Sequence, residues 1–278
     1  MFKKILIANR GEIAVRIIRT CREMGILTVA IYEPSDRNSL HVRLSDECVA
    51  LPGPQSFMDA AAILEIARER GVDAIHPGYG YLSEDADFIR ACERAGVVFV
   101  GPPAGVVDAL RNKIGALHAA RAAGIPTVIH SPRSFAEEEH AELAAAAREI
   151  GYPIVLKSCR GGRGRGERVV ASPQQLAEVT RRAQTETQAV YGNKQLYIER
   201  AVLPAHQIGV QVIADRHGAL VCLGDREGSV IHSNQKIVEE GPSLCLSPDQ
   251  RVELQATAMR LARLFNYRGL GTVEFIVD

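Results

Sequence analysis

The chain has 278 residues, of which 33 are acidic and 33 are basic, so its formal net charge is zero. This balance argues against nucleic acid or an anionic membrane as the main partner, because both are recognised through excess positive charge. The apolar runs are too short for a membrane span, and the run at residues 4–8 predicts a first strand rather than a signal sequence. We therefore expect a cytoplasmic protein with one large or two ordinary domains.

The first hundred residues alternate short β-branched runs with amphipathic helices, as in a parallel, doubly wound sheet covered on both faces. The predicted strands are 4–8, 27–32, 74–76 and 97–100, and the predicted helices are 12–24, 57–70 and 86–95. This pattern indicates a Rossmann-like layer. The first strand-to-helix turn, residues 8–12, lacks the Gly-x-Gly-x-x-Gly pattern, which argues against a classical NAD site.

A helix carrying Lys113 is predicted next, over residues 109–123, and a region of different pattern follows. Its predicted helices are 137–149, 173–189 and 248–265, and its predicted strands are 154–157, 168–171, 195–199, 208–215, 220–225 and 271–277. Strands joined by a glycine loop and flanked by helices favour a small α+β lid. We expect a first domain at 1–111 and a second at 112–278 with its lid at about 130–203.

Lys157 ends an apolar run and is followed by a glycine-rich loop over residues 160–167. Glycines let the backbone approach phosphate oxygens, and a lysine leaving a strand offsets phosphate charge, so the pattern favours a flap over a nucleotide. A plain hairpin turn and an Arg-Gly-Gly segment that binds RNA remain as alternatives, although the loop is short and lacks aromatic residues. The candidate phosphate-binding glycines are Gly161, Gly162, Gly164 and Gly166.

The six cysteines are scattered, without a Cys-x-x-Cys pair or the Cys/His spacing of a zinc site. We interpret them as buried thiols kept reduced in the cytoplasm. Their spacing therefore gives no reason to expect a metal centre built on cysteine.

Several segments spread over the whole chain resemble the biotin carboxylase component of biotin-dependent acetyl-CoA, propionyl-CoA and pyruvate carboxylases. These segments are 7–14 (IANRGEIA), 76–84 (HPGYGYLSE), 151–153 (GYP), 236–240 (KIVEE) and 267–275 (YRGLGTVEF). The resemblance implies an α/β protein: a Rossmann-like pre-ATP-grasp domain, then an incomplete ATP-grasp domain with an α+β lid and part of the central sheet. It also implies that ATP, with Mg²⁺, phosphorylates bicarbonate to carboxyphosphate, which delivers CO2 to the ureido nitrogen of biotin. The implied partners are a biotin carboxyl carrier protein or domain, a carboxyltransferase and a second copy of the chain.

The resemblance also assigns roles to residues. Lys113 and Lys157 would contact the ATP phosphates, and Lys236 would lie near bicarbonate and the γ-phosphate as the catalytic residue. The alternative for Lys113 and Lys157 is that each is simply a solvated surface lysine. The other implied site residues are Glu199, Arg200 and Val202 at the adenine, Tyr79 and Glu84 at biotin and bicarbonate, and Glu274 as a magnesium ligand.

The chain departs from the family pattern close to this chemistry. In the glycine flap, Arg163 and Arg165 interrupt the glycine run and Glu167 follows it. The family run Arg-His-x-Glu-x-Gln reads HQIGVQ over residues 206–211, and Gln-Arg-Arg-His-Gln-Lys reads IHSNQK over residues 231–236. Each charge-assisted bond lost in this way would cost about 1.5–3 kcal/mol.

The resemblance places the second magnesium carboxylate, the glutamate base and several arginines beyond Asp278. Because the sequence also ends directly on an apolar strand, we expect a chain cut short and not competent to carboxylate biotin alone. The alternatives are a catalytically degenerate nucleotide-binding or scaffold subunit of a carboxylase complex, and an ATP-grasp ligase that acts on another acceptor.

Overall fold

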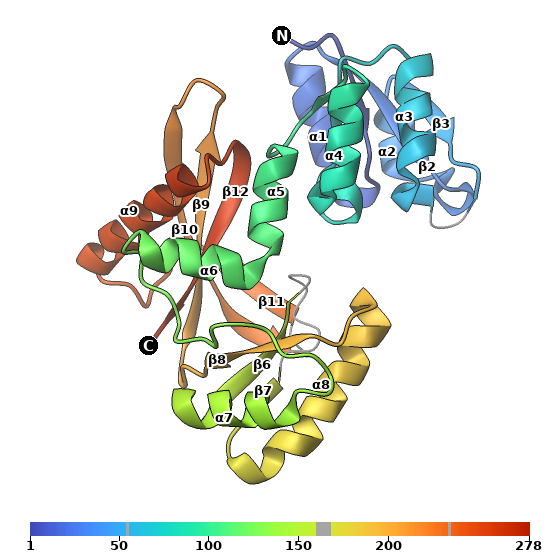
Figure 1. The fold of residues 1–278 in the computed structure, drawn as a ribbon. Helices are drawn as coiled ribbons and strands as arrows, with labels where there is room; N and C mark the ends of the chain where they lie inside the picture. The colour runs from blue at the N-terminus through green and yellow to red at the C-terminus, as the bar shows by residue number, and fades with distance from the viewer. Residues whose placement is uncertain (54–55, 160–167, 233–234) are drawn as a thin grey trace. The chain divides into compact units, whose positions relative to one another are not determined.

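The computed structural model describes residues 1–53, 56–159, 168–232 and 235–278. Its contacts divide the chain into unit 1, Met1–Val107, and unit 2, Asp108–Asp278 (Figure 1). The candidate glycines of the flap lie outside the described residues. Among the residues described, no helix is long and apolar enough to cross a membrane.

Unit 1 is built on a parallel sheet in the order β3-β2-β1-β4-β5, which confirms the predicted doubly wound layer. Its strands are β1 (Lys4–Ile7), β2 (Leu27–Tyr32), β3 (Glu47–Ala50), β4 (Ala74–His76) and β5 (Val98–Phe99). The helices that connect them are α1 (Gly11–Glu23), α2 (Leu40–Leu44), α3 (Ala60–Glu69) and α4 (Ala86–Arg94). The sequence pattern did not reveal α2 or β3, because both are short and the exposure of β3 alternates without a long apolar run.

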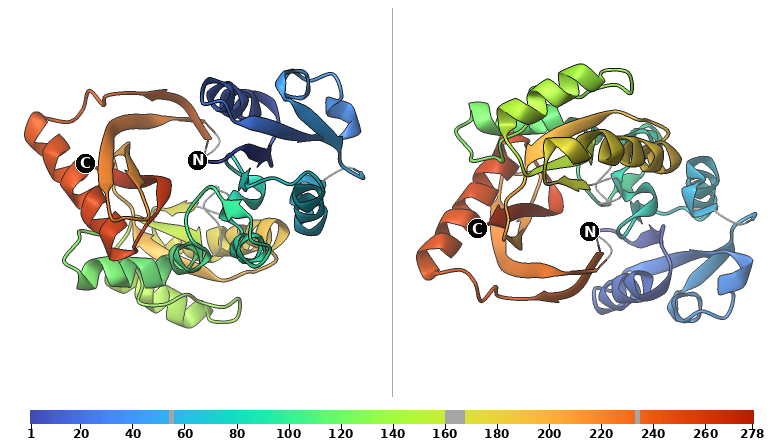
Figure 2. Two further views of the ribbon diagram at one scale, coloured as in Figure 1. Left: turned by 90° about the horizontal axis from the view of Figure 1, so that it is seen from above. Right: turned by 90° about the horizontal axis from the view of Figure 1, so that it is seen from below.

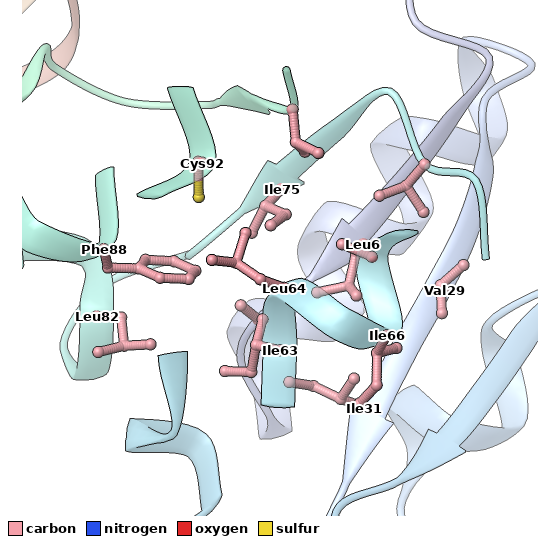
Figure 3. Close-up of a cluster of buried hydrophobic side chains, with 14 of the residues drawn as sticks. Leu6, Val29, Ile31, Ile63, Leu64, Ile66, Ile75, Leu82, Phe88 and Cys92 are labelled. Atoms are coloured by element: carbon pink, nitrogen blue, oxygen red, sulfur yellow. The ribbon is translucent and has the colours of Figure 1, made fainter. Parts of the chain in front are cut away.

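Alternation along β1 explains why both faces of this sheet are buried. Leu6 belongs to the cluster formed with α3 and α4, which Figure 3 shows around Ile63 and Phe88. Ile5 and Ile7 point to the opposite face, into a second cluster with residues of α1. A strand buried on both sides is the pattern expected of a parallel sheet covered by helices.

Unit 2 begins within the first of two helices, where the sequence pattern predicted a single helix over residues 109–123. The structure breaks the predicted helix at Asn112, between α5 (Ala104–Arg111) and α6 (Lys113–Ala122). The Asn112 side chain accepts a hydrogen bond from the Gly115 backbone N–H at 3.1 Å, which is a typical N-cap contact. The prediction of a single helix was therefore wrong, and Lys113 is the first residue of a helix instead of the fifth.

The lid sheet of unit 2 has the order β7-β6-β8 and is antiparallel. Its strands are β6 (Ile154–Ser158), β7 (Arg168–Val170) and β8 (Leu196–Arg200). Helices α7 (His140–Ile150) and α8 (Leu176–Tyr191) pack on one face of it, as Figure 1 shows. Their apolar residues share a core with Leu156 and Ile198, so the other face is left for polar side chains.

The floor sheet of unit 2 has the order β11-β10-β9-β12, also antiparallel. Its strands are β9 (His206–Ala214), β10 (Leu220–His232), β11 (Gln235–Glu240) and β12 (Gly269–Val277). Helix α9 (Pro248–Leu264) lies against this sheet in both views of Figure 2 and shares a core with Val210 and Val212. A capping box formed by Ser247 and Gln250 fixes where α9 begins.

Candidate functional site

A cavity of about 1160 Å³ lies within unit 2, between residues of α6, the lid sheet, the floor sheet and α9. We call it the large cavity. Many of the side chains that the sequence analysis singled out line it together. These residues are Lys113, Lys157, Glu199, Val202, Lys236 and Glu274.

Strand alternation places the lid residues on the wall of the cavity. Lys157 on β6 lies directly opposite Tyr197 on β8, while the neighbouring Leu156 is fully buried in the lid core. Lys157 Nζ lies 2.9 Å from Glu199 Oε2, and the Tyr197 hydroxyl donates to Glu199 Oε1 at 2.8 Å. The lid therefore presents a lysine paired with a buried carboxylate, which a buried tyrosine hydroxyl holds in position.

Lys113 reaches the cavity from the first residue of α6. A helix N-terminus carries partial positive charge from its unpaired backbone N–H groups, so the lysine and the helix end favour the same sign of ligand. This part of the wall is suited to an anion. The break at Asn112 is what puts the lysine there.

Lys236 on β11 lies next to Glu274 on β12, with Lys236 Nζ 2.5 Å from Glu274 Oε1. These strands are at the two edges of the floor sheet, so the lysine side chain has to cross the strands between them. Glycine makes that path possible: a Cβ at Gly228 on β10 would lie 2.7 Å from Lys236 Cδ. Lys236 Nζ also lies 3.6 Å from Glu239 Oε1, so the lysine faces carboxylates on both edge strands.

Other predicted site residues lie elsewhere. The Arg200 side chain does not line the cavity, because its Nη1 donates to the Ile150 carbonyl at 2.7 Å. Its backbone N–H donates to the Ile129 carbonyl. A role for Arg200 at a nucleotide stays a prediction.

Tyr79 and Glu84 belong to unit 1. The Tyr79 hydroxyl donates to Glu12, and Glu84 is exposed at the end of the short helix η3 (Tyr81–Glu84). Asn9 orders this turn: its Nδ2 donates to the carbonyls of Pro77 and Tyr79, each at 2.8 Å. Hydrogen bonds therefore join the segments 7–14 and 76–84, which carry part of the resemblance.

The cavity wall also contains residues that the sequence analysis did not name as site residues. Tyr197 is one of them, although its position two residues before Glu199 on a strand signals that both face the same side. Gln207 and Gln235 are others, and the resemblance had marked their segments only as departures from the family pattern. The apolar part of the wall includes Leu117, Ile125, Ile208, Leu261 and Phe275.

Comparison with known proteins defines the class of this site. Residues 112–278 match the family described as the carbamoyl-phosphate synthase L chain, ATP binding domain. Residues 1–107 match the family described as the biotin carboxylase, N-terminal domain. The chain therefore joins a domain of biotin carboxylase type to an ATP-binding domain, and the large cavity lies within the range of the latter.

Relatives that align over the full length of this chain agree with both family matches. The chain is 43% identical to a biotin carboxylase of Halalkalibacterium halodurans over 281 residues, and 42% identical to one of Pseudomonas aeruginosa. Each alignment covers 100% of this chain and 62% of the relative. This chain belongs to the biotin carboxylase family, and it spans 62% of the length of these curated relatives.

Solved structures show the same fold. A biotin carboxylase complex with β,γ-ATP from Campylobacter jejuni has a TM-score of 0.96 and 35% identity, covering 100% of this chain and 63% of that one. The biotin carboxylase domain dimer of Hydrogenobacter thermophilus 2-oxoglutarate carboxylase, with MgADP and bicarbonate, has a TM-score of 0.95 and 39% identity. That alignment covers 100% of this chain and 61% of the other.

Proposed function

We propose that the large cavity binds MgATP and that the chain serves the ATP-dependent, ligase-type carboxylation of biotin. The observation that carries the proposal is the convergence of Lys113, Lys157 and Lys236 on one cavity, from a helix start, the lid sheet and the floor sheet. Lysines from separate elements are well placed to offset the charge of a triphosphate, because phosphoryl transfer is catalysed mainly by positioning and neutralisation.

The residues on the cavity wall fit both parts of the nucleotide. The apolar side chains, with Val202 and Glu199 at the edge of the lid sheet, suit an adenine that needs stacking and a few polar contacts. The carboxylate of Glu274 offers the oxygen ligands that Mg²⁺ prefers, and the ion when bound would neutralise phosphate charge. The pairing of Lys236 with Glu274 supports a role for this lysine beside both the transferred phosphoryl group and the proposed metal ligand.

For the reaction we propose bicarbonate as the phosphoryl acceptor and biotin on a carrier protein as the carboxyl acceptor. The support is the family membership, together with a solved relative whose structure holds MgADP and bicarbonate. A carboxyltransferase would then determine the final substrate, an acyl-CoA as in fatty acid biosynthesis or a keto acid. We propose that the chain forms a homodimer, and the dimeric structure of the relative supports this. We also propose that it works in the cytoplasm.

The test is ADP formation by the protein that contains this chain, with MgATP, bicarbonate and free biotin. We expect cleavage that depends on bicarbonate and rises with biotin, and a loss of at least about 100-fold in kcat for Lys236→Ala. The control is Lys194→Ala, which changes a lysine that pairs with Glu137 and does not line the cavity. ATP binding without bicarbonate-dependent cleavage would instead support the catalytically degenerate, nucleotide-binding alternative.

A further inference from the structure

A group of potential metal ligands lies outside the cavity wall, at one side of the floor sheet. His206 begins β9, Glu227 lies on β10, and Cys245 lies in the segment before α9. One ligand atom of each, the His206 Nδ1, a Glu227 carboxylate oxygen and the Cys245 Sγ, lies within 4.8 Å of the others. We call these residues the His-Glu-Cys cluster.

The central carboxylate of the cluster is held in place by serines. The Ser229 hydroxyl donates to Glu227 Oε1 at 2.9 Å, and the Ser243 hydroxyl donates to Glu227 Oε2 at 2.9 Å. His206 Nδ1 lies 2.6 Å from Glu227 Oε1, and Ser243 Oγ lies 3.1 Å from Cys245 Sγ. A carboxylate fixed by such neighbours is oriented before a ligand arrives, which is how supporting hydrogen bonds act in metal sites.

The donor set favours a metal ion that is intermediate between hard and soft. Imidazole nitrogen and thiolate sulfur bind Zn²⁺ well and are poor ligands for Mg²⁺ or Ca²⁺, which prefer oxygen throughout. A tetrahedral Zn²⁺ with bonds of about 2.0–2.3 Å needs ligand atoms about 3.3–3.8 Å apart. To reach that spacing the 2.6 Å contact between His206 and Glu227 would open, and any pair of ligand atoms near the 4.8 Å limit would close by about 1 Å.

We propose that His206, Glu227 and Cys245 form a binding site for a Zn²⁺-like divalent ion, with a fourth position open to water. Three protein ligands and one open position are a common arrangement for this ion. The site differs from the magnesium position proposed at Glu274, in both its residues and its donor chemistry.

The cluster adjoins the large cavity through its neighbours. His206 precedes Gln207, Cys245 precedes Leu246, and Glu227 pairs in register with Ile208. Gln207, Ile208 and Leu246 all line the cavity. An ion in the cluster would therefore tie the start of β9 to the segment before α9, directly behind the cavity wall.

The cluster also corrects one sequence-based interpretation. Among the residues described, Cys21 and Cys92 are buried, Cys48 is exposed, and Cys159, Cys222 and Cys245 are intermediate. The expectation that all six thiols are buried was therefore wrong. Spacing could not predict the cluster, because His206 and Glu227 are 21 residues apart and meet only through strand pairing.

The test is a titration of the metal-free chain with Zn²⁺ by calorimetry and with Co²⁺ by absorbance, both without nucleotide. We expect one tightly bound ion per chain and a thiolate-to-Co²⁺ charge-transfer band. Cys245→Ser should abolish the band, and Cys245→Ser and His206→Gln should each weaken Zn²⁺ binding at least about tenfold.

Cys222→Ser and His217→Gln are the matched controls, because neither residue belongs to the cluster, and both should bind as the unchanged chain does. Circular dichroism checks that each variant folds. His206 is about half exposed, so His206→Gln keeps the test decisive even if Cys245→Ser is unstable. No uptake at micromolar Zn²⁺, or equal uptake by both ligand variants, would overturn the proposal.

Discussion

Lys157 Nζ lies 2.9 Å from Glu199 Oε2, and Glu199 is only 6% exposed. The other lysine–carboxylate pair of the cavity, Lys236 with Glu274, joins a half-buried lysine to a carboxylate that is 65% exposed. The two pairs share the same chemistry and differ in burial. They should therefore differ in what they contribute to folding.

The first prediction compares these pairs. Glu199→Ala removes the buried carboxylate that pairs with Lys157 and accepts a hydrogen bond from the Tyr197 hydroxyl, which should lower the free energy of unfolding by about 3 kcal/mol. Glu274→Ala removes an exposed partner and should cost less than about 1 kcal/mol. Urea denaturation of both variants measures the difference. Equal losses would show that burial does not distinguish the pairs.

The second prediction concerns acid stability in unit 1. Burial lowers the pKa of His76 to about 4, and the charge of Arg16 adds to this shift. The unfolded chain would bind a proton near pH 6.5 and the folded chain only near pH 4, so stability should fall as the pH falls through that window. The loss is at most about 3 kcal/mol. Denaturation of the unchanged chain and of His76→Gln at several pH values checks it, and parallel curves would contradict it.

The third prediction concerns the turn that Asn9 holds. Gly78 has φ of 64°, and a Cβ there would lie 2.7 Å from Asn9 Nδ2. Gly71 has φ of 59° but open space around it, so it is a matched control for the backbone effect alone. Gly71→Ala should cost about 1–2 kcal/mol, and Gly78→Ala about 1–3 kcal/mol more. Thermal unfolding of the two variants measures the difference, and equal costs would remove the contact as its cause.

The fourth prediction addresses a departure from the family pattern. Gln207 lines the large cavity where the pattern has histidine, so Gln207→His should replace a neutral amide donor by an imidazole that, when protonated beside a phosphate, donates a charge-assisted hydrogen bond to a nucleotide oxygen. We expect ATP affinity to rise about tenfold. Gln195→His, outside the cavity wall, is the control. Unchanged or weaker binding by Gln207→His, measured by fluorescence titration, would contradict this prediction.

Much of the fold could be predicted from local pattern. Strands β2 (Leu27–Tyr32) and β4 (Ala74–His76) coincide with predicted strands, because short β-branched runs between helices indicate the buried strands of a parallel sheet. The break at Asn112 could not be predicted, because good helix formers lie on both sides and only the side-chain cap marks it. Strand β11 was missed because nearly all of it is exposed, so it carries no alternating pattern.

The candidate site depended on two kinds of information. The resemblance supplied Lys113, Lys236 and Glu274, which no local pattern marks as unusual. The contact of Lys157 with Glu199 required the register of β6 against β8, which sequence spacing does not contain. The His-Glu-Cys cluster required both strand register and the path of the segment before α9.

The most direct test of the central proposal is calorimetric binding of MgATP to the unchanged chain, Lys157→Ala, Lys113→Ala and the control Lys194→Ala. We predict micromolar affinity for the unchanged chain and for the control, and at least about tenfold weaker binding for Lys157→Ala and Lys113→Ala. Absence of ATP binding, or affinity that is the same in all of these proteins, would contradict the assignment of the large cavity to a nucleotide.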